Sequence, residues 1–280
     1  MSIHDIHEIS KDWSKSEFEK RLRENIFHRV IGAGLPDPPE EMEISGQVSE
    51  KVKGLIYGSN SEKIRSVLLL FNLATLLQDP KSNMRFQFDN YKNQYWDIEH
   101  IRSVADKPPG RYDERQQWLE HCVRYFESRK DDDEKGVVGK EGKEKKEEEK
   151  LIEEMKDFIQ LPRAEARDEM FEELFNKVLE KFGEKPEAEV NHGISNLTLL
   201  DQNTNRSYKN AVFAVKRERL LERDQAGIFV PLCTRNVFLK CYNPMVDNAI
   251  RWGEKDCEGY EEAIIKTLTK FFCGQLEGSR

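Results

Sequence analysis

The spacing of hydrophobic residues predicts helices in the N-terminal region, residues 1–80. One face of the first predicted helix carries apolar residues at every fourth position: Phe18, Leu22, Ile26 and Val30. The segment Ile64–Leu77 is apolar nearly all round, which is typical of a buried helix. Between these two segments the sequence GLPDPPEE, residues 34–41, is rich in residues that interrupt helices.

The pattern changes to that of a β-strand in residues 81–104. Met84, Phe86 and Phe88 alternate with polar residues, and the sequence DNYKN at 89–93 is typical of a turn. Residues 94–101 would then form the second arm of a hairpin. We therefore expect the first strand or strands of a core in this region.

Residues 105–190 return to a helical spacing and predict a long helical insertion. The apolar residues that carry this spacing are Trp118, Cys122, Phe126, Met155, Phe158, Met170, Phe171, Leu174 and Leu179. Within the insertion, residues 128–150 are almost entirely charged or small. Such a segment buries too little apolar surface to offset its ordering entropy, so we expect a flexible linker or a frayed, charged helix near 128–150.

The C-terminal region, residues 191–280, combines both patterns. The sequence ISNLTLL at 194–200 predicts a short strand, and SYKNAVFAVKRERLLER at 207–223 predicts a basic helix. A C-terminal helical part of the same domain would follow.

Composition restricts the class of protein without naming it. The 280 residues are 37% hydrophobic and 35% charged, with a formal net charge of -8, which suits one or two soluble domains. Because no long uncharged apolar stretch and no secretory leader pattern occurs, we expect a cytoplasmic protein without a membrane partner. The five cysteines contain no C-x-x-C pair, so free thiols are expected rather than disulfides or a thiolate zinc site.

Candidate chemistry begins at the end of the predicted strand, in the sequence YWDIEHIRS at 95–103. It holds two acids, Asp97 and Glu99, directly before His100. An acid beside a histidine is by itself common on protein surfaces. The segment SNLTLLDQNTNRSYKN at 195–210 adds a strand that begins with Asn196 and a helix that opens with Asn205.

Together these segments resemble the ββα-metal, or His-Asn-His (HNH), nuclease motif, and their spacing is similar to that of the HNH domain of RNA-guided CRISPR nucleases. Over roughly residues 45–275, four segments resemble the C-terminal nuclease domain of GmrSD-type modification-dependent restriction proteins: WDIEHI, NLTLLDQNTNRSYKN, FVPLCTRNVFLKCYNP and RWGEKDCEGYEEAIIKTL. The resemblance implies an α+β, mostly helical fold, in which an HNH-like ββα-metal nuclease core is embedded in helical bundles and carries a long helical insertion.

The resemblance also implies an activity, that of a metal-dependent DNA endonuclease acting as the effector domain of an anti-phage restriction system. His100 would be the general base that takes a proton from water. Glu99 and Asn205 would be oxygen ligands of one divalent metal, Mg²⁺ or alternatively Mn²⁺, with Asp97 as a reserve ligand. Asn196 would fix the imidazole or the loop beside it.

Several basic residues are candidate contacts to DNA phosphates: Arg206, Lys209, Lys216 and Arg217. The alternative for these residues is a solvated helix face paired with neighbouring acids. His192, close to Asn196, is either a third site residue or an ordinary loop histidine.

Two other functions share the same motif. One is an RNase that uses this site, and the other is a catalytically silent interaction module. In the family that the chain resembles, a ParB-like nucleotide-binding domain precedes the nuclease, so such a domain or subunit is the expected partner besides DNA.

Strand geometry raises one difficulty for the metal site. Successive side chains of a regular strand point to opposite faces, so Glu99 and His100 can reach one phosphate only where the backbone twists, bulges or ends.

Overall fold

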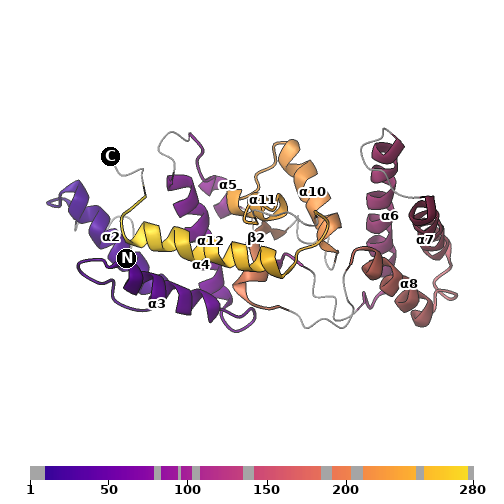
Figure 1. Ribbon diagram of the computed structural model, residues 1–280, viewed down its shortest axis with the longest axis horizontal. Helices are drawn as coiled ribbons and strands as arrows, with labels where there is room; N and C mark the ends of the chain where they lie inside the picture. Colours follow the sequence, from indigo (N-terminus) through magenta and orange to yellow (C-terminus); the bar gives the residue numbers. More distant parts are fainter. Residues whose placement is uncertain are drawn as a thin grey trace. The chain divides into compact units, whose positions relative to one another are not determined.

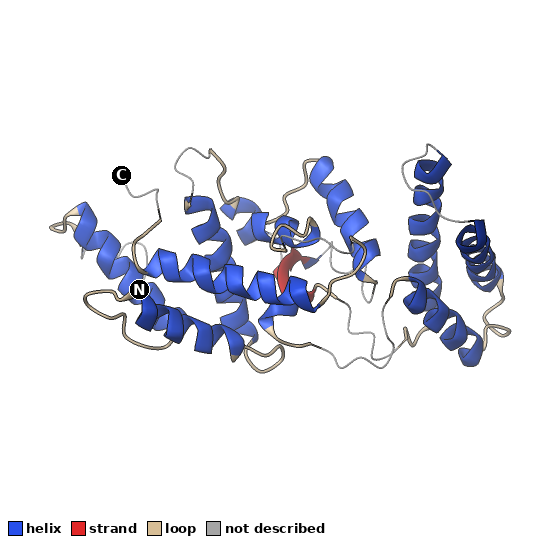
Figure 2. Cartoon of the chain, viewed as in Figure 1, coloured by secondary structure: helices blue, strands red, loops and turns tan. Residues whose placement is uncertain are grey.

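The computed structural model describes residues 10–78, 83–93, 96–102, 108–134, 142–183, 191–202, 211–243 and 249–276. It is mostly helical with a single small sheet in the described part, which agrees with the expected α+β class (Figure 2). The chain divides into two compact units, residues 1–86 with 259–280 and residues 87–258. The long C-terminal helix α12, Glu254–Phe272, is shared between them.

The described elements of the first unit are helices, as the periodicity predicts (Figure 1). They are α2 (Lys15–Val30), α3 (Glu41–Lys53), α4 (Ser61–Leu77) and the later part of α12. The ring of Phe27 on α2 meets Phe272 edge-on at 4.8 Å, and Phe71 on α4 lies 6.0 Å from Tyr260. These contacts make α12 part of the core, so the two ends of the sequence fold together.

The burial of α4 follows its sequence closely, whereas that of α2 does not. Seven residues of α4 are buried, on more than one face of the helix. On α2 the buried residues are Phe27 and Val30, and Leu22 is 40% exposed. The predicted helix is therefore confirmed, but its contact with the core is concentrated in its last turn.

Three helices in the second unit account for the predicted insertion: α6 (Tyr112–Glu134), α7 (Gly142–Gln160) and α8 (Asp168–Lys181). Trp118 joins α6 to α8, with ring centroids 4.8 Å from Phe175 and 6.2 Å from Phe171. Phe158 of α7 contacts the same Phe171 at 5.6 Å. The aromatic residues that set the helical period thus form the core of this bundle.

The charged segment 128–150 was expected to be a flexible linker or a frayed helix. Residues 128–134 continue α6 and residues 142–150 begin α7, so of the two expected alternatives the charged helix describes these residues. The physical reason is that Glu148 and Leu151 of α7 are buried, which ties its first turns to the bundle. Residues 135–141 lie outside the described part.

The sheet differs from the predicted hairpin. Its two strands are β1 (Trp96–His100) and β2 (Leu197–Asp201), paired antiparallel with Trp96 opposite Asp201 and His100 opposite Leu197. Residues 83–87 form no strand, and Phe88–Asn93 is a short helix, α5. The prediction that residues 84–88 pair with β1 is therefore wrong.

The physical reason lies in the two segments themselves. All five residues of β2 are buried, so its backbone groups need a strand partner in the interior. The segment before β1 packs through side chains instead, because Tyr91 of α5 lies 5.5 Å from Trp96 and the Trp96 indole donates to the carbonyl of Asn90 at 3.4 Å.

Two further helices follow β2, namely α10 (Phe213–Gln225) and α11 (Leu232–Phe238). Thr234 of α11 donates to the carbonyl of Leu199 at 2.7 Å and lies 2.9 Å from the hydroxyl of Thr198. The rings of Phe213 and Phe238 stack at 5.4 Å, which joins α10 to α11. The sheet is thus held against helices that follow it in the chain.

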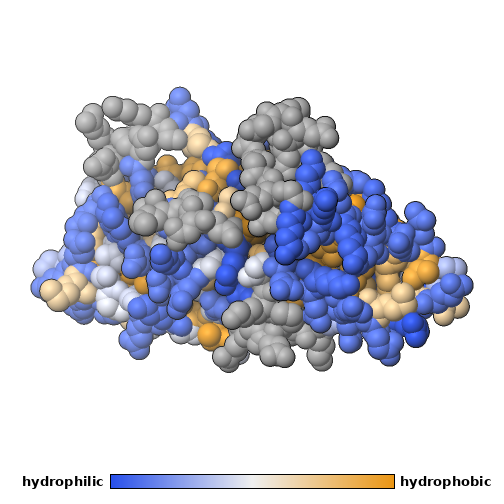
Figure 3. All heavy atoms as spheres, turned by 45° about the vertical axis from the view of Figure 1, so that its right-hand side comes forward, coloured by the Kyte–Doolittle hydropathy of each residue, from blue (hydrophilic) through white to orange (hydrophobic). Residues whose placement is uncertain are grey.

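The surface drawn in Figure 3 is largely hydrophilic, with smaller areas of hydrophobic residues between the charged ones. Among the helices that the structure describes, none combines the length and the hydrophobicity that a membrane crossing requires.

Candidate active site

The candidate site lies where β1 ends. Trp96 and Ile98 anchor the strand with 4% and 6% of their surfaces exposed, and the ladder to β2 continues as far as His100. Beyond the strand, the amide of Ile101 donates to the carbonyl of Asn196 at 2.8 Å. The last residues of β1 are therefore held by backbone bonds on a rigid element.

Glu99 and His100 have different side-chain partners, as expected for neighbours on a regular strand. The Glu99 carboxylate pairs with the ammonium of Lys216 from α10. The His100 imidazole faces His192, with Nε2 3.3 Å from Nδ1 and the two rings nearly perpendicular. The strand thus connects an ion pair and a histidine pair through adjacent residues.

Asn196 ties the histidine-bearing segments together. It is the last residue of a short 3-10 turn, Ile194–Asn196, and so stands one position before the strand that it was expected to open. Its Oδ1 accepts from the amide of Arg102 at 2.8 Å, and its Nδ2 donates to the carbonyls of Arg102 and Asn191 at 3.2 and 2.9 Å. One buried side chain therefore links the residues just after His100 to the residue just before His192.

The loop that carries His192 has its own supports. The Asn191 side chain accepts from the amide of Gly193 at 2.8 Å and donates to the hydroxyl of Ser195 at 3.1 Å. The indole of Trp252 donates to the carbonyl of Ser195 at 3.3 Å. These bonds hold the loop in place although His192 itself is exposed.

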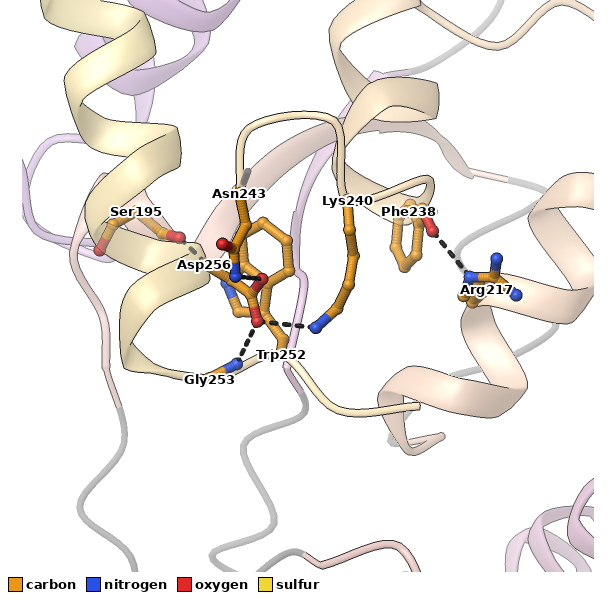
Figure 4. Close-up of polar contacts among 8 residues, drawn as sticks. All are labelled: Ser195, Arg217, Phe238, Lys240, Asn243, Trp252, Gly253 and Asp256. Atoms are coloured by element: carbon orange, nitrogen blue, oxygen red, sulfur yellow. Dashed lines mark hydrogen bonds and ion pairs between the residues drawn. The ribbon is translucent and has the colours of Figure 1, made fainter. Parts of the chain in front are cut away.

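A buried polar cluster supports the same region from the start of α12 (Figure 4). The Asp256 carboxylate accepts from the ammonium of Lys240 at 2.8 Å, from the side chain of Asn243 at 2.9 Å and from the amide of Gly253 at 2.8 Å. The bond to Gly253 closes the first turn of α12, as the acid of a capping box does. Figure 4 shows Trp252 beside this cluster. The indole that donates to the carbonyl of Ser195 therefore lies against the start of α12.

Lys216 differs from its predicted role as a DNA-phosphate contact. Only 4% of its side chain is exposed, and its Nζ donates to Glu99 Oε1 and, at 2.7 Å, to the carbonyl of His100. A surface contact to phosphate is therefore wrong for this residue. Nothing in the helical spacing distinguished it from its basic neighbours, because only packing against β1 buries it.

The predicted phosphate contact Arg217 is half-buried, and its Nε donates to the carbonyl of Phe238 at 2.9 Å. Part of its guanidinium thus anchors α10 to the end of α11. Asn205, Arg206 and Lys209 lie outside the described residues. The described helix after β2 begins at Phe213.

Burial lowers the pKa of His100 from 6.5 to about 4, with further contributions from the positive charge of Lys216 and from His192. The imidazole is therefore neutral near neutral pH and carries a lone pair on one ring nitrogen. A neutral imidazole is the form required of a proton acceptor.

The described residues fit a magnesium site only in part. Glu99 supplies the type of oxygen donor that Mg²⁺ prefers, and Asp97 lies two positions earlier on the same strand. However, the Glu99 carboxylate already contacts the Lys216 ammonium. In the part of the chain that the structure describes, no group of three or more His, Cys, Asp or Glu side chains is placed to hold a metal ion.

Comparison with known proteins identifies the class. Residues 110–266, more than half of the chain, match the family described as the C-terminal domain of GmrSD restriction endonucleases. The chain belongs to this family. The match includes His192, Asn196, Asn205 and Lys216, whereas Glu99 and His100 precede its first residue. No curated protein and no solved structure matches the chain.

Proposed function

We propose that the protein is a metal-dependent DNA endonuclease and that β1, β2 and α10 form an HNH-type ββα-metal core. Membership of a restriction endonuclease family supports this class of activity. The observation that carries the proposal is a half-buried His100 held at the end of a strand that pairs with the strand leading to α10.

His100 is the proposed general base. Its Nε2 lies 3.3 Å from Nδ1 of His192, and in the neutral form the imidazole of His100 would take the proton of the attacking water. His192 would then orient the His100 ring through the contact at Nε2. Asn196 contributes by holding the backbone on both sides of the histidine pair.

Glu99 and Asn205 are the proposed ligands of one divalent cation, with Mg²⁺ expected, Mn²⁺ as an alternative and Asp97 in reserve. When bound, such an ion would stabilise negative charge on the scissile phosphate and on the leaving oxygen. Lys216 holds the carboxylate of Glu99 at the strand end. In this proposal the same carboxylate would also bind the divalent metal ion.

The wider setting follows from the family. We propose that the protein acts in the cytoplasm as the effector of an anti-phage restriction system. Recognition of nucleotide or of modified DNA would then belong to a ParB-like domain or subunit. Phosphate contacts carry no base information, so this chain by itself should nick DNA slowly and with little sequence preference.

The test is nicking of a supercoiled plasmid with Mg²⁺, with and without a chelator, by the parent protein and by His100→Ala. We expect nicking by the parent that the chelator abolishes, and a rate lower by about 10²–10⁴-fold in His100→Ala, the usual contribution of a positioned base. His28→Ala, an exposed histidine on α2, is the matched control and should cleave like the parent.

Two results would contradict the proposal. Cleavage of a structured RNA in place of the plasmid would indicate an RNase with the same site. Absence of cleavage of either substrate by a well-folded parent would favour a silent interaction module.

A further inference from the structure

Among the described residues, Lys216 is the most deeply buried charged group in contact with the candidate site. It lies in the first turn of α10, only 3% of the residue is exposed, and its amide closes a helical bond to the carbonyl of Val212 at 3.1 Å. Removing an ammonium group from water costs several kcal/mol unless its hydrogens are matched by acceptors. The acceptors of the Lys216 ammonium therefore indicate which part of the structure this buried charge stabilises.

Both acceptors belong to the end of β1. Lys216 Nζ donates to Oε1 of Glu99 and to the backbone oxygen of His100, residues that stand 117 and 116 positions earlier in the chain. One bond holds a side chain that is a proposed metal ligand, and the other holds the main chain of the proposed base. A surface ion pair would not fix two successive residues in this way.

The backbone bond is the more informative of the two. A carboxylate could neutralise a lysine without any contact to the main chain. The bond to the carbonyl of His100 restrains the peptide unit that follows the imidazole-bearing Cα atom, and Asn196 restrains the next residues through Arg102. The backbone that carries the His100 side chain is thus held by contacts from α10 and from the turn before β2.

We propose that Lys216 is a positioning residue of the candidate active site, acting through Glu99 and His100 rather than by contact with nucleic acid. This inference rests on the proposed nuclease function for its kinetic consequence. Its structural consequence, the fixed orientation of the His100 ring, stands independently of activity.

The experiment compares Lys216→Met, which keeps the apolar stem and removes the charge, with Lys216→Arg and with Lys177→Met. Lys177 is a suitable control because it also pairs with a glutamate, Glu154 at 3.0 Å, but on the surface of the helical bundle. Steady-state nicking is measured at several salt concentrations, and the imidazole ¹⁵N resonances of the six histidines are recorded for each variant. The His100 resonances are assigned by their loss in His100→Gln.

We expect Lys216→Met to lower kcat by about 10- to 100-fold, the usual effect of losing a group that orients a catalytic residue or metal ligand. KM for DNA and the salt dependence should remain unchanged, and the His100 resonances should shift. Lys216→Arg should recover part of kcat, because the guanidinium retains the charge with a different geometry. Lys177→Met should leave kcat, KM, the salt dependence and the His100 resonances unchanged.

Two results would overturn the proposal. A raised KM with unchanged kcat, together with a salt slope reduced by about one, would indicate a direct phosphate contact. Unchanged kcat and unchanged His100 resonances in folded Lys216→Met would show that the pair is only structural.

The experiment also gives an answer if the parent shows no nicking or if Lys216→Met does not fold. If the parent does not nick DNA, the proposed function fails, and the resonances alone still test the positioning. If Lys216→Met does not fold, the double variant Glu99→Gln with Lys216→Met removes both charges of the buried pair, and a His100 spectrum unchanged in that variant would also overturn the proposal.

Discussion

The helical bundle α6–α8 and the sheet region β1–β2–α10 use the same residue types in opposite ways. In the bundle, Lys177 pairs with Glu154 at 3.0 Å while their side chains remain 45% and 33% exposed. In the sheet region, the side chains of Lys216 and Glu99 are 4% and 14% exposed. A lysine–glutamate pair thus lies on the surface in the bundle, whereas a second pair of the same type lies in the interior of the sheet region.

The difference teaches which charges are expected to matter. Exposed pairs contribute little because water and salt screen them and their long side chains lose entropy. A buried pair need not stabilise the fold relative to apolar residues, but breaking it leaves an unmatched charge in the interior. A charged pair that is buried beside the candidate site is therefore a candidate for a role in that site.

The largest expected effect on stability comes from breaking the buried pair. Glu99→Ala leaves the Lys216 ammonium buried without its carboxylate, and we expect the free energy of unfolding to fall by about 3–5 kcal/mol. Urea denaturation at neutral pH measures the change. A loss below about 1 kcal/mol would place this pair in the same class as those of the bundle.

Asn196→Ala is expected to have the next largest effect. It removes the partners of the Arg102 amide and of two carbonyls, and because these bonds are only part-buried, we expect a loss at the lower end of the about 1–3 kcal/mol that unmatched buried groups cost. The nicking rate should fall even under conditions where the variant remains folded, because the substitution removes the bonds that hold the segments carrying His100 and His192. Denaturation and nicking measured on the same preparation separate the two effects, and a folded variant with full activity would contradict the assigned role.

The pH dependence of stability provides a third comparison. Burial lowers the pKa of His100 from 6.5 to about 4, so between these values the unfolded chain binds a proton that the folded protein does not. The contribution of neutral His100 is therefore fully present above 6.5 and is lost as the pH falls towards about 4. As the pH falls from 6.5 to about 4, we expect the urea concentration at the unfolding midpoint to decrease, and to decrease less in His100→Gln.

His121 contributes in the same direction, since burial and then Arg219 lower its pKa as well. His121→Gln is therefore run beside His100→Gln. An unaltered pH dependence in His100→Gln would contradict the burial of a neutral imidazole at the site.

The smallest expected effect is that of an exposed pair. Lys177→Ala should change the free energy of unfolding by less than about 1 kcal/mol, and added salt should reduce even this difference. Denaturation at low and high salt checks it. A loss comparable to that of Glu99→Ala would remove the distinction between the two regions.

Much of the fold follows from local patterns. The helices α2, α4, α6, α7 and α8 could be predicted from apolar spacing, because a helix satisfies its backbone within one segment and exposes one face to its neighbours. The strands β1 and β2 were also recognisable from their sequences. The pairing was not, since the residues before β1 alternate like a strand and yet form no ladder.

Parts of the candidate site were likewise visible in the sequence. The residues that the sequence singles out, His100, Glu99 and Asn196, lie together at the junction of β1 and β2, and the Asn196 side chain bonds to the backbone of Arg102 and Asn191; their catalytic and metal-binding roles stay predictions. Lys216 was assigned to the wrong surface. His192 was one of two open alternatives, and its contact with His100 now favours a place in the site.

The sequence by itself determined most of the helices, the two strands and the chemistry that the residues of this protein can supply, because periodicity, turn residues and side-chain types are local properties. Tertiary structure decided which of these residues meet. His100 and His192 are 92 positions apart, and Lys216 and Glu99 are 117 apart. No local pattern encodes such contacts; they exist because an entirely buried β2 pairs with β1 and α10 packs beside them, which removes one lysine from water and places it between two residues of the candidate site.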